Sequence, residues 1–213
     1  KDMDELKRRL GEDRRFFSYF HPALEDEPII FVQVALTNGL GKSIQEIMKP
    51  RSEGDKKYDT ATFYSISNCQ EGLSRVTLGN FLIKRVVYEL QEELPNVKNF
   101  GTLSPIVGFR DWFLTLEENK IKNILGKIPY ESIFFLKSKD LKIGDIRIAQ
   151  NKDAIIKLVA HYLVNEKNKK MLPINDVCRF HLGNGAIIDD IVVNANISDV
   201  GFNRSYGVMV NYL

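Results

Sequence analysis

The sequence has few of the residues and runs that mark several large classes of protein. Its 213 residues include only two cysteines, too few for a disulfide framework or a cysteine-rich zinc site. No apolar run approaches the roughly 18 residues that cross a bilayer, and residues 1–10 form a charged amphipathic segment unlike a signal peptide. We therefore expect no membrane partner and a reducing compartment, the cytoplasm by default, with an organelle left open.

An excess of charge of one sign is also missing. Thirty Lys and Arg face twenty-eight Asp and Glu, a formal net charge of +2. A field this weak does not steer a chain onto nucleic acid, so we expect no nucleic-acid partner and expect any anionic ligand to be held by local geometry. At 44% hydrophobic and 27% charged residues, the composition predicts a single globular domain over residues 1–213. The first residue is Lys rather than Met, and we expect the domain to come from a longer chain with flanking domains.

The first half of the chain alternates between strand and helix patterns. Residues 29–36 follow Pro28 as a β-branched apolar run that stops at a Thr-Asn-Gly turn, which predicts a buried central strand. Charged residues 49–57 predict an exposed loop, and Ser43 with Glu46 has the spacing of a helix cap. Further expected elements are a helix at 1–10, a strand at 61–67, an amphipathic helix at 78–94 that Pro95 stops, and a strand at 97–106.

The second half is mostly helical and then returns to strands. Apolar residues recur at helical spacing between about 109 and 170, which predicts an insertion of several short helices. After Pro173 we expect strands at 177–181, 186–193 and 206–213, with Asn184-Gly185 as a hairpin turn. The order predicts an α+β (mixed α/β) fold.

A glycine-containing loop before the 78–94 helix is a candidate phosphate site. The start of a helix offers free backbone N–H groups to an anion, and the loop adds two glycines and Arg75. It matches neither GxGxxG nor a Walker sequence, which disfavours dinucleotides and nucleoside triphosphates. A plain turn into the helix is an equally physical interpretation, and spacing alone favours it.

Three histidines provide the candidate acid–base groups. His21 and His161 fit structural or surface roles, because one lies beside Pro22 and the other on an apolar helix pattern. His181 lies near an expected strand end and a tight turn, where a side chain can reach a cleft. A lone histidine is more often structural than catalytic, so both interpretations stay open. No HExxH or paired-histidine spacing supports a metal site.

Nucleophile motifs are scarce as well. There is no GxSxG elbow. Ser104, before Pro105 at an expected strand end, presents its hydroxyl to a site in one interpretation and caps a turn in the other. Cys69 and Cys178 stand in no motif, and we expect both to be small buried residues.

Six blocks of sequence carry a more specific signal. In order and spacing they resemble the catalytic domain of the malonyl-CoA decarboxylase family. The blocks are residues 63–67 (FYSIS), 70–73 (QEGL), 78–87 (LGNFLIKRVV), 103–109 (LSPIVGF), 180–186 (FHLGNGA) and 207–212 (GVMVNY).

The resemblance implies the fold of the GNAT acetyltransferases, with a central, mostly antiparallel sheet flanked by helices. It implies malonyl-CoA as substrate and acetyl-CoA and CO₂ as products, with Ser104 and His181 as catalytic residues. No metal, biotin or pyridoxal phosphate is implied, because the thioester carbonyl itself accepts the electrons. The implied seat of the coenzyme A pyrophosphate is formed by Ser74, Arg75, Val76, Thr77, Leu78, Gly79 and Asn80.

Several questions stay open at this point. Either His181 or Ser104 could contact the thioester oxygen or deliver the proton to the enolate, and the acyl group could be malonyl or methylmalonyl. A second hypothesis is a GNAT-like loading domain of a polyketide synthase, which decarboxylates an acyl-CoA and passes the acyl group to an acyl carrier protein. A third is a coenzyme A-binding regulatory module without turnover. An amine acetyltransferase is least favoured, since nothing identifies an amine pocket.

Overall fold

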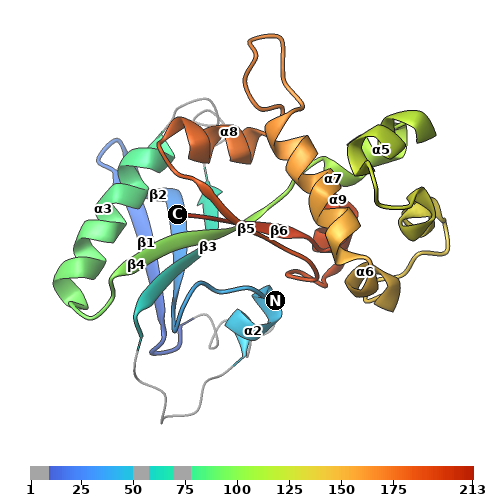
Figure 1. Cartoon of the computed structure of the whole chain (residues 1–213). Coiled ribbons are helices and arrows are strands. Elements are labelled where there is room, and N and C mark those ends of the chain that lie inside the picture. Colours follow the sequence, from blue (N-terminus) through green and yellow to red (C-terminus); the bar gives the residue numbers. More distant parts are fainter. Residues whose placement is uncertain (1–9, 50–57, 70–77) are drawn as a thin grey trace. The chain divides into compact units, whose positions relative to one another are not determined.

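The computed structural model describes residues 10–49, 58–69 and 78–213. The chain, drawn as a ribbon in Figure 1, folds as two compact units, residues 1–103 and 104–213. Each unit has its own apolar core. In the described ranges, no helix is long and apolar enough to cross a membrane. The helix expected at residues 1–10 and the loop expected at 49–57 fall almost wholly outside the described ranges. The single domain over 1–213 stays a prediction.

The first unit contains a sheet with one long helix. β1 pairs antiparallel with β2, and β2 pairs antiparallel with β3. β3 then pairs parallel with β4, which begins in this unit. β2 therefore has a strand on each side, as expected of a central strand. The elements are β1 (Arg14–His21), β2 (Leu24–Thr37), α2 (Ile44–Met48), β3 (Thr60–Asn68), α3 (Leu78–Glu93) and β4 (Asn99–Pro105).

The helical spacing of its apolar residues explains why α3 packs against the sheet. Leu82, Val86 and Leu90 lie four residues apart, so they share one face of α3, and all three belong to the first core. The buried side chains of β2 and β3 complete this core, among them Val32 and Phe63. Each such side chain contributes about 1.5–3 kcal/mol by leaving water. The strands near 29–36, 61–67 and 97–106 and the helix at 78–94 are therefore confirmed.

Two local signals in this unit are also confirmed. The Ser43 side chain accepts a hydrogen bond from the Glu46 backbone N–H and caps α2. Gly39, in the turn after β2, has a φ of 72°, a left-handed conformation that glycine adopts without steric cost. Cys69 corrects an expectation: its thiol is exposed rather than buried, because the residue lies just beyond the end of β3.

The second unit is mainly helical, and the helical insertion expected between 109 and 170 is confirmed. Its core joins side chains of α4, α5, α7, α8 and α9 with those of β6, and β5 pairs antiparallel with β6. The elements are α4 (Phe109–Thr115), α5 (Glu118–Leu125), η2 (Tyr130–Ser132), η3 (Phe134–Lys137), α6 (Ile146–Gln150), α7 (Lys152–Val164), α8 (Asp176–Gly183), β5 (Ile188–Val192), α9 (Asp199–Ser205) and β6 (Met209–Tyr212).

The strand expected at 177–181 is wrong, because this segment is helix α8. Asn175 caps its start, and Cys178 and His181, three residues apart, form its buried face. Asn184 and Gly185 end the helix instead of turning a hairpin, with Gly185 at a φ of 87°. A left-handed glycine serves both kinds of turn, so the Asn-Gly pair could not distinguish them. The short helix α9 was also not anticipated.

Candidate active site

Ser104 lies at the end of β4, where Pro105 closes the strand. Its residue surface is 6% exposed. The chain then leaves the strand through Ile106, which is fully buried, and through Gly108, whose φ of 82° turns it into α4. The hydroxyl is thus held at a fixed strand end and not on a mobile surface loop.

His181 comes from a different element and meets Ser104. It occupies the last turn of α8 and is 5% exposed. Its Nε2 lies 3.3 Å from Ser104 Oγ, although the two residues are 77 positions apart. This distance is at the long end of the hydrogen-bonding range. The structure therefore brings together the two side chains that the resemblance implies.

Burial controls the protonation of His181. Loss of water around the imidazole lowers the pKa of His181 to about 4, because desolvation disfavours the charged ring. The ring is therefore neutral near pH 7. A neutral imidazole carries one N–H, so Nε2 either donates to Ser104 Oγ or accepts from it.

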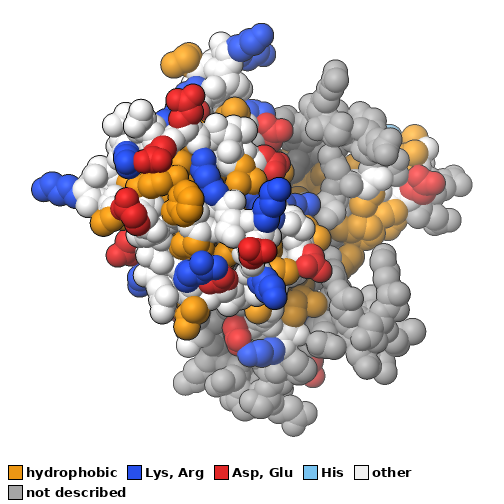
Figure 2. All heavy atoms as spheres, turned by 90° about the vertical axis from the view of Figure 1, so that its right-hand side faces the viewer, with side chains coloured by type: hydrophobic (Ala, Val, Ile, Leu, Met, Phe, Trp, Pro, Cys, Tyr) orange, Lys and Arg blue, Asp and Glu red, His pale blue; other side chains and the backbone are white. Residues whose placement is uncertain are grey.

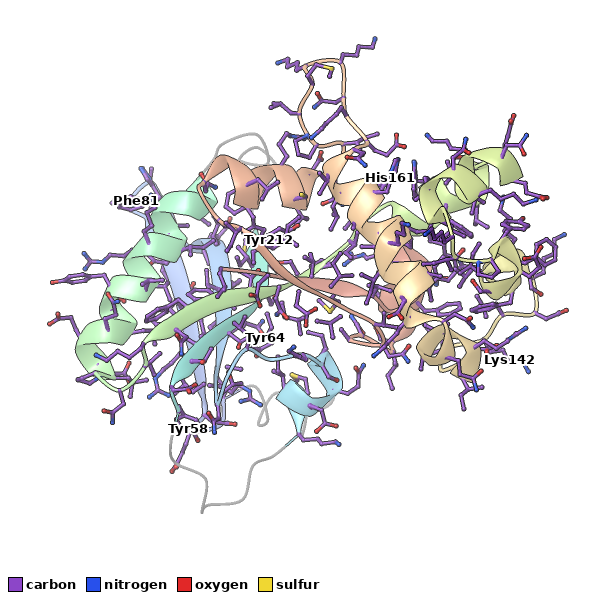
Figure 3. All side chains as sticks on the ribbon, viewed as in Figure 1. Tyr58, Tyr64, Phe81, Lys142, His161 and Tyr212 are labelled. Atoms are coloured by element: carbon purple, nitrogen blue, oxygen red, sulfur yellow. The ribbon has the colours of Figure 1, made fainter. Side chains whose placement is uncertain are left out.

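Tyr212 forms one wall of the site. Its ring stacks on the His181 imidazole with centroids 4.3 Å apart and planes 20° apart, and it is 1% exposed. Figure 3 shows Tyr212 at the end of β6. Burial, and then the nearby Cys178 thiol, raise the pKa of Tyr212 well above its ordinary value, so its hydroxyl stays protonated. Tyr212 lies in a block that carries the resemblance, but nothing in the sequence gave it a role.

The other histidines have no comparable surroundings. His21 is exposed, and its Nδ1 accepts a hydrogen bond from the Ala23 backbone N–H. The ring of His161 stacks on Trp112 at 6.1 Å, and its Nε2 lies 3.4 Å from Glu166 Oε1. These are the surface and structural roles expected of them. Across residues 10–49, 58–69 and 78–213, no group of three or more His, Cys, Asp or Glu side chains is arranged to hold a metal ion.

The predicted coenzyme A seat is only partly described. Ser74, Arg75, Val76 and Thr77 lie outside the described residues, as does most of the loop before them. Leu78, Gly79 and Asn80 are the first three residues of α3, and only their backbone is described. The pyrophosphate seat therefore stays a prediction.

Surface charge on the second unit is mixed. Figure 2 shows cationic and anionic side chains interspersed over its helical face. Several form ion pairs within this unit, among them Lys122 with Glu118 at 2.5 Å and Lys120 with Glu166 at 2.8 Å. This face offers no broad field of one sign, in keeping with the small net charge.

Comparison with known proteins places the chain. The family model described as the malonyl-CoA decarboxylase C-terminal domain matches residues 1–213. The chain belongs to the malonyl-CoA decarboxylase family. It is 38% identical to "Malonyl-CoA decarboxylase, mitochondrial" from Rattus norvegicus, covering 100% of this chain and 47% of that protein. The protein of the same name from Anser anser anser is 37% identical, covering 98% and 45%. This family member thus spans about half the length of the curated relatives it matches.

Solved structures confirm the fold class. Malonyl-CoA decarboxylase from Rhodopseudomonas palustris matches with a TM-score of 0.85 at 38% identity, covering all of this chain and 53% of that one. The loading GNATL domain of CurA from Lyngbya majuscula matches with a TM-score of 0.59 at 13% identity, covering 100% and 82%. At that identity the likeness shows the fold alone. The family member is therefore a mixed α/β protein with a GNAT-like fold and mostly antiparallel strand pairing.

Proposed function

We propose that this chain decarboxylates malonyl-CoA to acetyl-CoA and CO₂. The observation that carries the proposal is the buried pair of Ser104 and His181, 3.3 Å apart in a member of the malonyl-CoA decarboxylase family. The names of the relatives indicate the class of reaction. The pair provides a hydroxyl and an imidazole, which can act as hydrogen-bond and proton donors in that reaction. Loading of an acyl carrier protein rests on a likeness that shows only the fold, so it enters as an outcome of the test.

The reaction needs an acceptor for an electron pair and a donor of a proton. When the bond between the α-carbon and the carboxylate breaks, its electron pair moves into the thioester and forms an enolate. A new C–H bond then consumes one proton, which solvent replaces. A preorganised donor to the developing oxyanion is worth about 3 kcal/mol, and a placed proton donor about 10² to 10⁴ in rate.

The neutral ring of His181 permits two arrangements of the hydrogen bond to Ser104. With the proton on Nε2, the imidazole donates to Ser104 Oγ and leaves the Ser104 hydroxyl hydrogen free for the substrate. With the proton on Nδ1, the Ser104 hydroxyl donates its hydrogen to Nε2 and cannot donate it to the substrate. The first arrangement is the one that serves the reaction, so we assign Ser104 as the group that contacts the thioester oxygen or the enolate carbon, and His181 as the group that orients the Ser104 hydroxyl.

The coenzyme A seat, the acyl group and the location of the protein are proposals as well. The coenzyme A pyrophosphate is assigned to residues 74–80 on the resemblance and on the free N–H groups that start a helix. The acyl group is malonyl in the first instance, with methylmalonyl as the alternative. For location we keep a reducing compartment. The goose and rat relatives are named mitochondrial, so an organelle is the first place to look.

Mass spectrometry of the products tests the function. The chain is incubated with malonyl-CoA, methylmalonyl-CoA and succinyl-CoA, with and without an acyl carrier protein. Malonyl-CoA is expected to yield acetyl-CoA, and succinyl-CoA, which cannot form the same enolate, is expected to stay intact. Acyl groups found on the carrier would favour the loading function instead. Unchanged malonyl-CoA in every arm would reject both enzymatic hypotheses and leave a binding module.

A further inference from the structure

One backbone carbonyl beside the site receives two side-chain hydrogen bonds. Val107, three residues after Ser104, accepts from the Tyr162 hydroxyl at 3.0 Å and from the Asn175 amide Nδ2 at 2.8 Å. Tyr162 comes from α7, and Asn175 precedes α8. Burial raises the pKa of Tyr162, so its hydroxyl remains a donor. Segments that are distant in sequence therefore converge on the loop that follows the serine.

Asn175 also makes a second hydrogen bond, which connects it to the helix of His181. Its Oδ1 accepts from the Cys178 backbone N–H at 2.8 Å and caps α8, the helix that carries His181. The residue is 3% exposed. One rigid amide group therefore ties the start of the histidine helix to the loop behind the serine strand.

We propose that Asn175 and Tyr162 are positioning residues that set the separation of Ser104 from His181 through the Val107 carbonyl. The proposal rests on the proposed function. Their hydrogen bonds reach the loop after Ser104 and the start of the helix that carries His181, so their effect passes through these two segments. Asn175 is the more direct link, because it is hydrogen-bonded both to the Val107 loop and to the start of α8.

The loop after Ser104 depends on these hydrogen bonds for its conformation. Between Pro105 and α4 the chain has no regular strand or helix, and Gly108 in its left-handed conformation gives it a sharp turn. The two hydrogen bonds to the Val107 carbonyl favour one orientation of this peptide. A displacement of about 1 Å between reacting groups can cost about 10² in rate. A small stabilising contact is therefore expected to have a large effect on turnover.

The chain offers variants that separate positioning from folding. Asn175→Asp keeps the oxygen that caps α8, since Asp caps as well as Asn, but replaces the donor to Val107 with an acceptor. Tyr162→Phe removes the second donor and keeps the aromatic ring. Ser198→Ala is the matched control: Ser198 caps α9 by accepting from the Gly201 N–H at 3.2 Å, and its hydroxyl donates to Asn196 Oδ1.

The test measures kcat, KM and thermal midpoint of the full 213-residue chain with malonyl-CoA. Asn175→Asp and Tyr162→Phe are each expected to lower kcat about tenfold or more with KM changed less than about twofold. Ser198→Ala is expected to lower the thermal midpoint and leave kcat within about twofold. Equal kcat values in the parent, Asn175→Asp and Tyr162→Phe would overturn the proposal. Should Asn175→Asp not fold, Tyr162→Phe decides alone.

A second readout does not depend on activity. The His181 ring is titrated by NMR in the parent, the two variants and the control. Loosening the loop is expected to admit water and raise the pKa of His181 from about 4 toward its ordinary value in the two variants only. An unmoved titration in both variants would contradict the positioning role. A parent that shows this titration but no turnover rejects the proposed function and leaves the positioning of the pair intact.

Discussion

Acid should destabilise this protein through His181 in a measurable way. The pKa of His181 is about 4 in the folded chain, against an ordinary value of 6.5. Between these values the unfolded chain binds a proton that the folded chain does not, so stability falls as the pH falls. The contribution of the neutral imidazole is fully present above pH 6.5 and is lost progressively toward pH 4. Integrated from pH 7.5 down to about pH 5, the loss amounts to about 2 kcal/mol.

The experiment compares the parent with His181→Gln. Glutamine keeps a polar group in reach of Ser104 but does not titrate, and the carboxylates that also respond to acid are shared by both proteins. Urea unfolding is followed by the fluorescence of Trp112, the one tryptophan of the chain, which lies in the same unit as His181.

Between about pH 7.5 and about pH 5, the free energy of unfolding of the parent is expected to fall by about 2 kcal/mol more than that of the variant. Equal losses would mean that the imidazole ionises as easily in the folded chain as in the unfolded one, which contradicts a lowered pKa of His181. A larger loss in the variant would reverse the sign and contradict it as well.

Three further outcomes follow from packing and exposure. Gly201→Ala should destabilise the chain by about 2 kcal/mol or more, because the added Cβ would meet the Asn196 carbonyl oxygen at 2.4 Å; unchanged urea unfolding would contradict this. A thiol reagent should label Cys69, which is exposed, and reach the buried Cys178 only after unfolding, so two labels on the folded chain by mass spectrometry would be the wrong result. Tyr212→Ala should cost about 3–5 kcal/mol, whereas Tyr212→Phe keeps the ring stack on the imidazole and should cost less than about 1 kcal/mol; similar losses in both would show that the stack is not what stabilises this wall.

The sequence predicted the long, strongly periodic elements well. Apolar residues recur at a helical period in α3, and β2 contains a β-branched apolar run that a turn signal ends. Helix α8 has eight residues, and the Asn-Gly pair after it serves hairpins and helix ends alike. The cap at Asn175 and the spacing of Cys178 and His181 were the available signals for a helix. They are weaker than the turn signal that favoured strands.

The site itself depended on long-range contacts that no local pattern contains. The proximity of Ser104 and His181 was implied by the family resemblance alone, since 77 positions separate them. The Tyr212 stack and the bonds to Val107 follow from packing of α7, α8 and β6 in three dimensions. The depressed pKa of His181 likewise comes from burial, which sequence patterns do not quantify.

Under the proposed function, Ser104 and His181 act as one unit on a malonyl thioester. The most direct measurement is CO₂ release from malonyl-CoA by the parent, Ser104→Ala, His181→Gln and the double variant. Each single change is expected to lower kcat by about 10² to 10⁴, and the double variant is expected to be no slower than the slower single variant, since groups that act as a unit are not additive. A double variant whose loss equals the product of the two single losses, or single variants that turn over like the parent, would contradict the account.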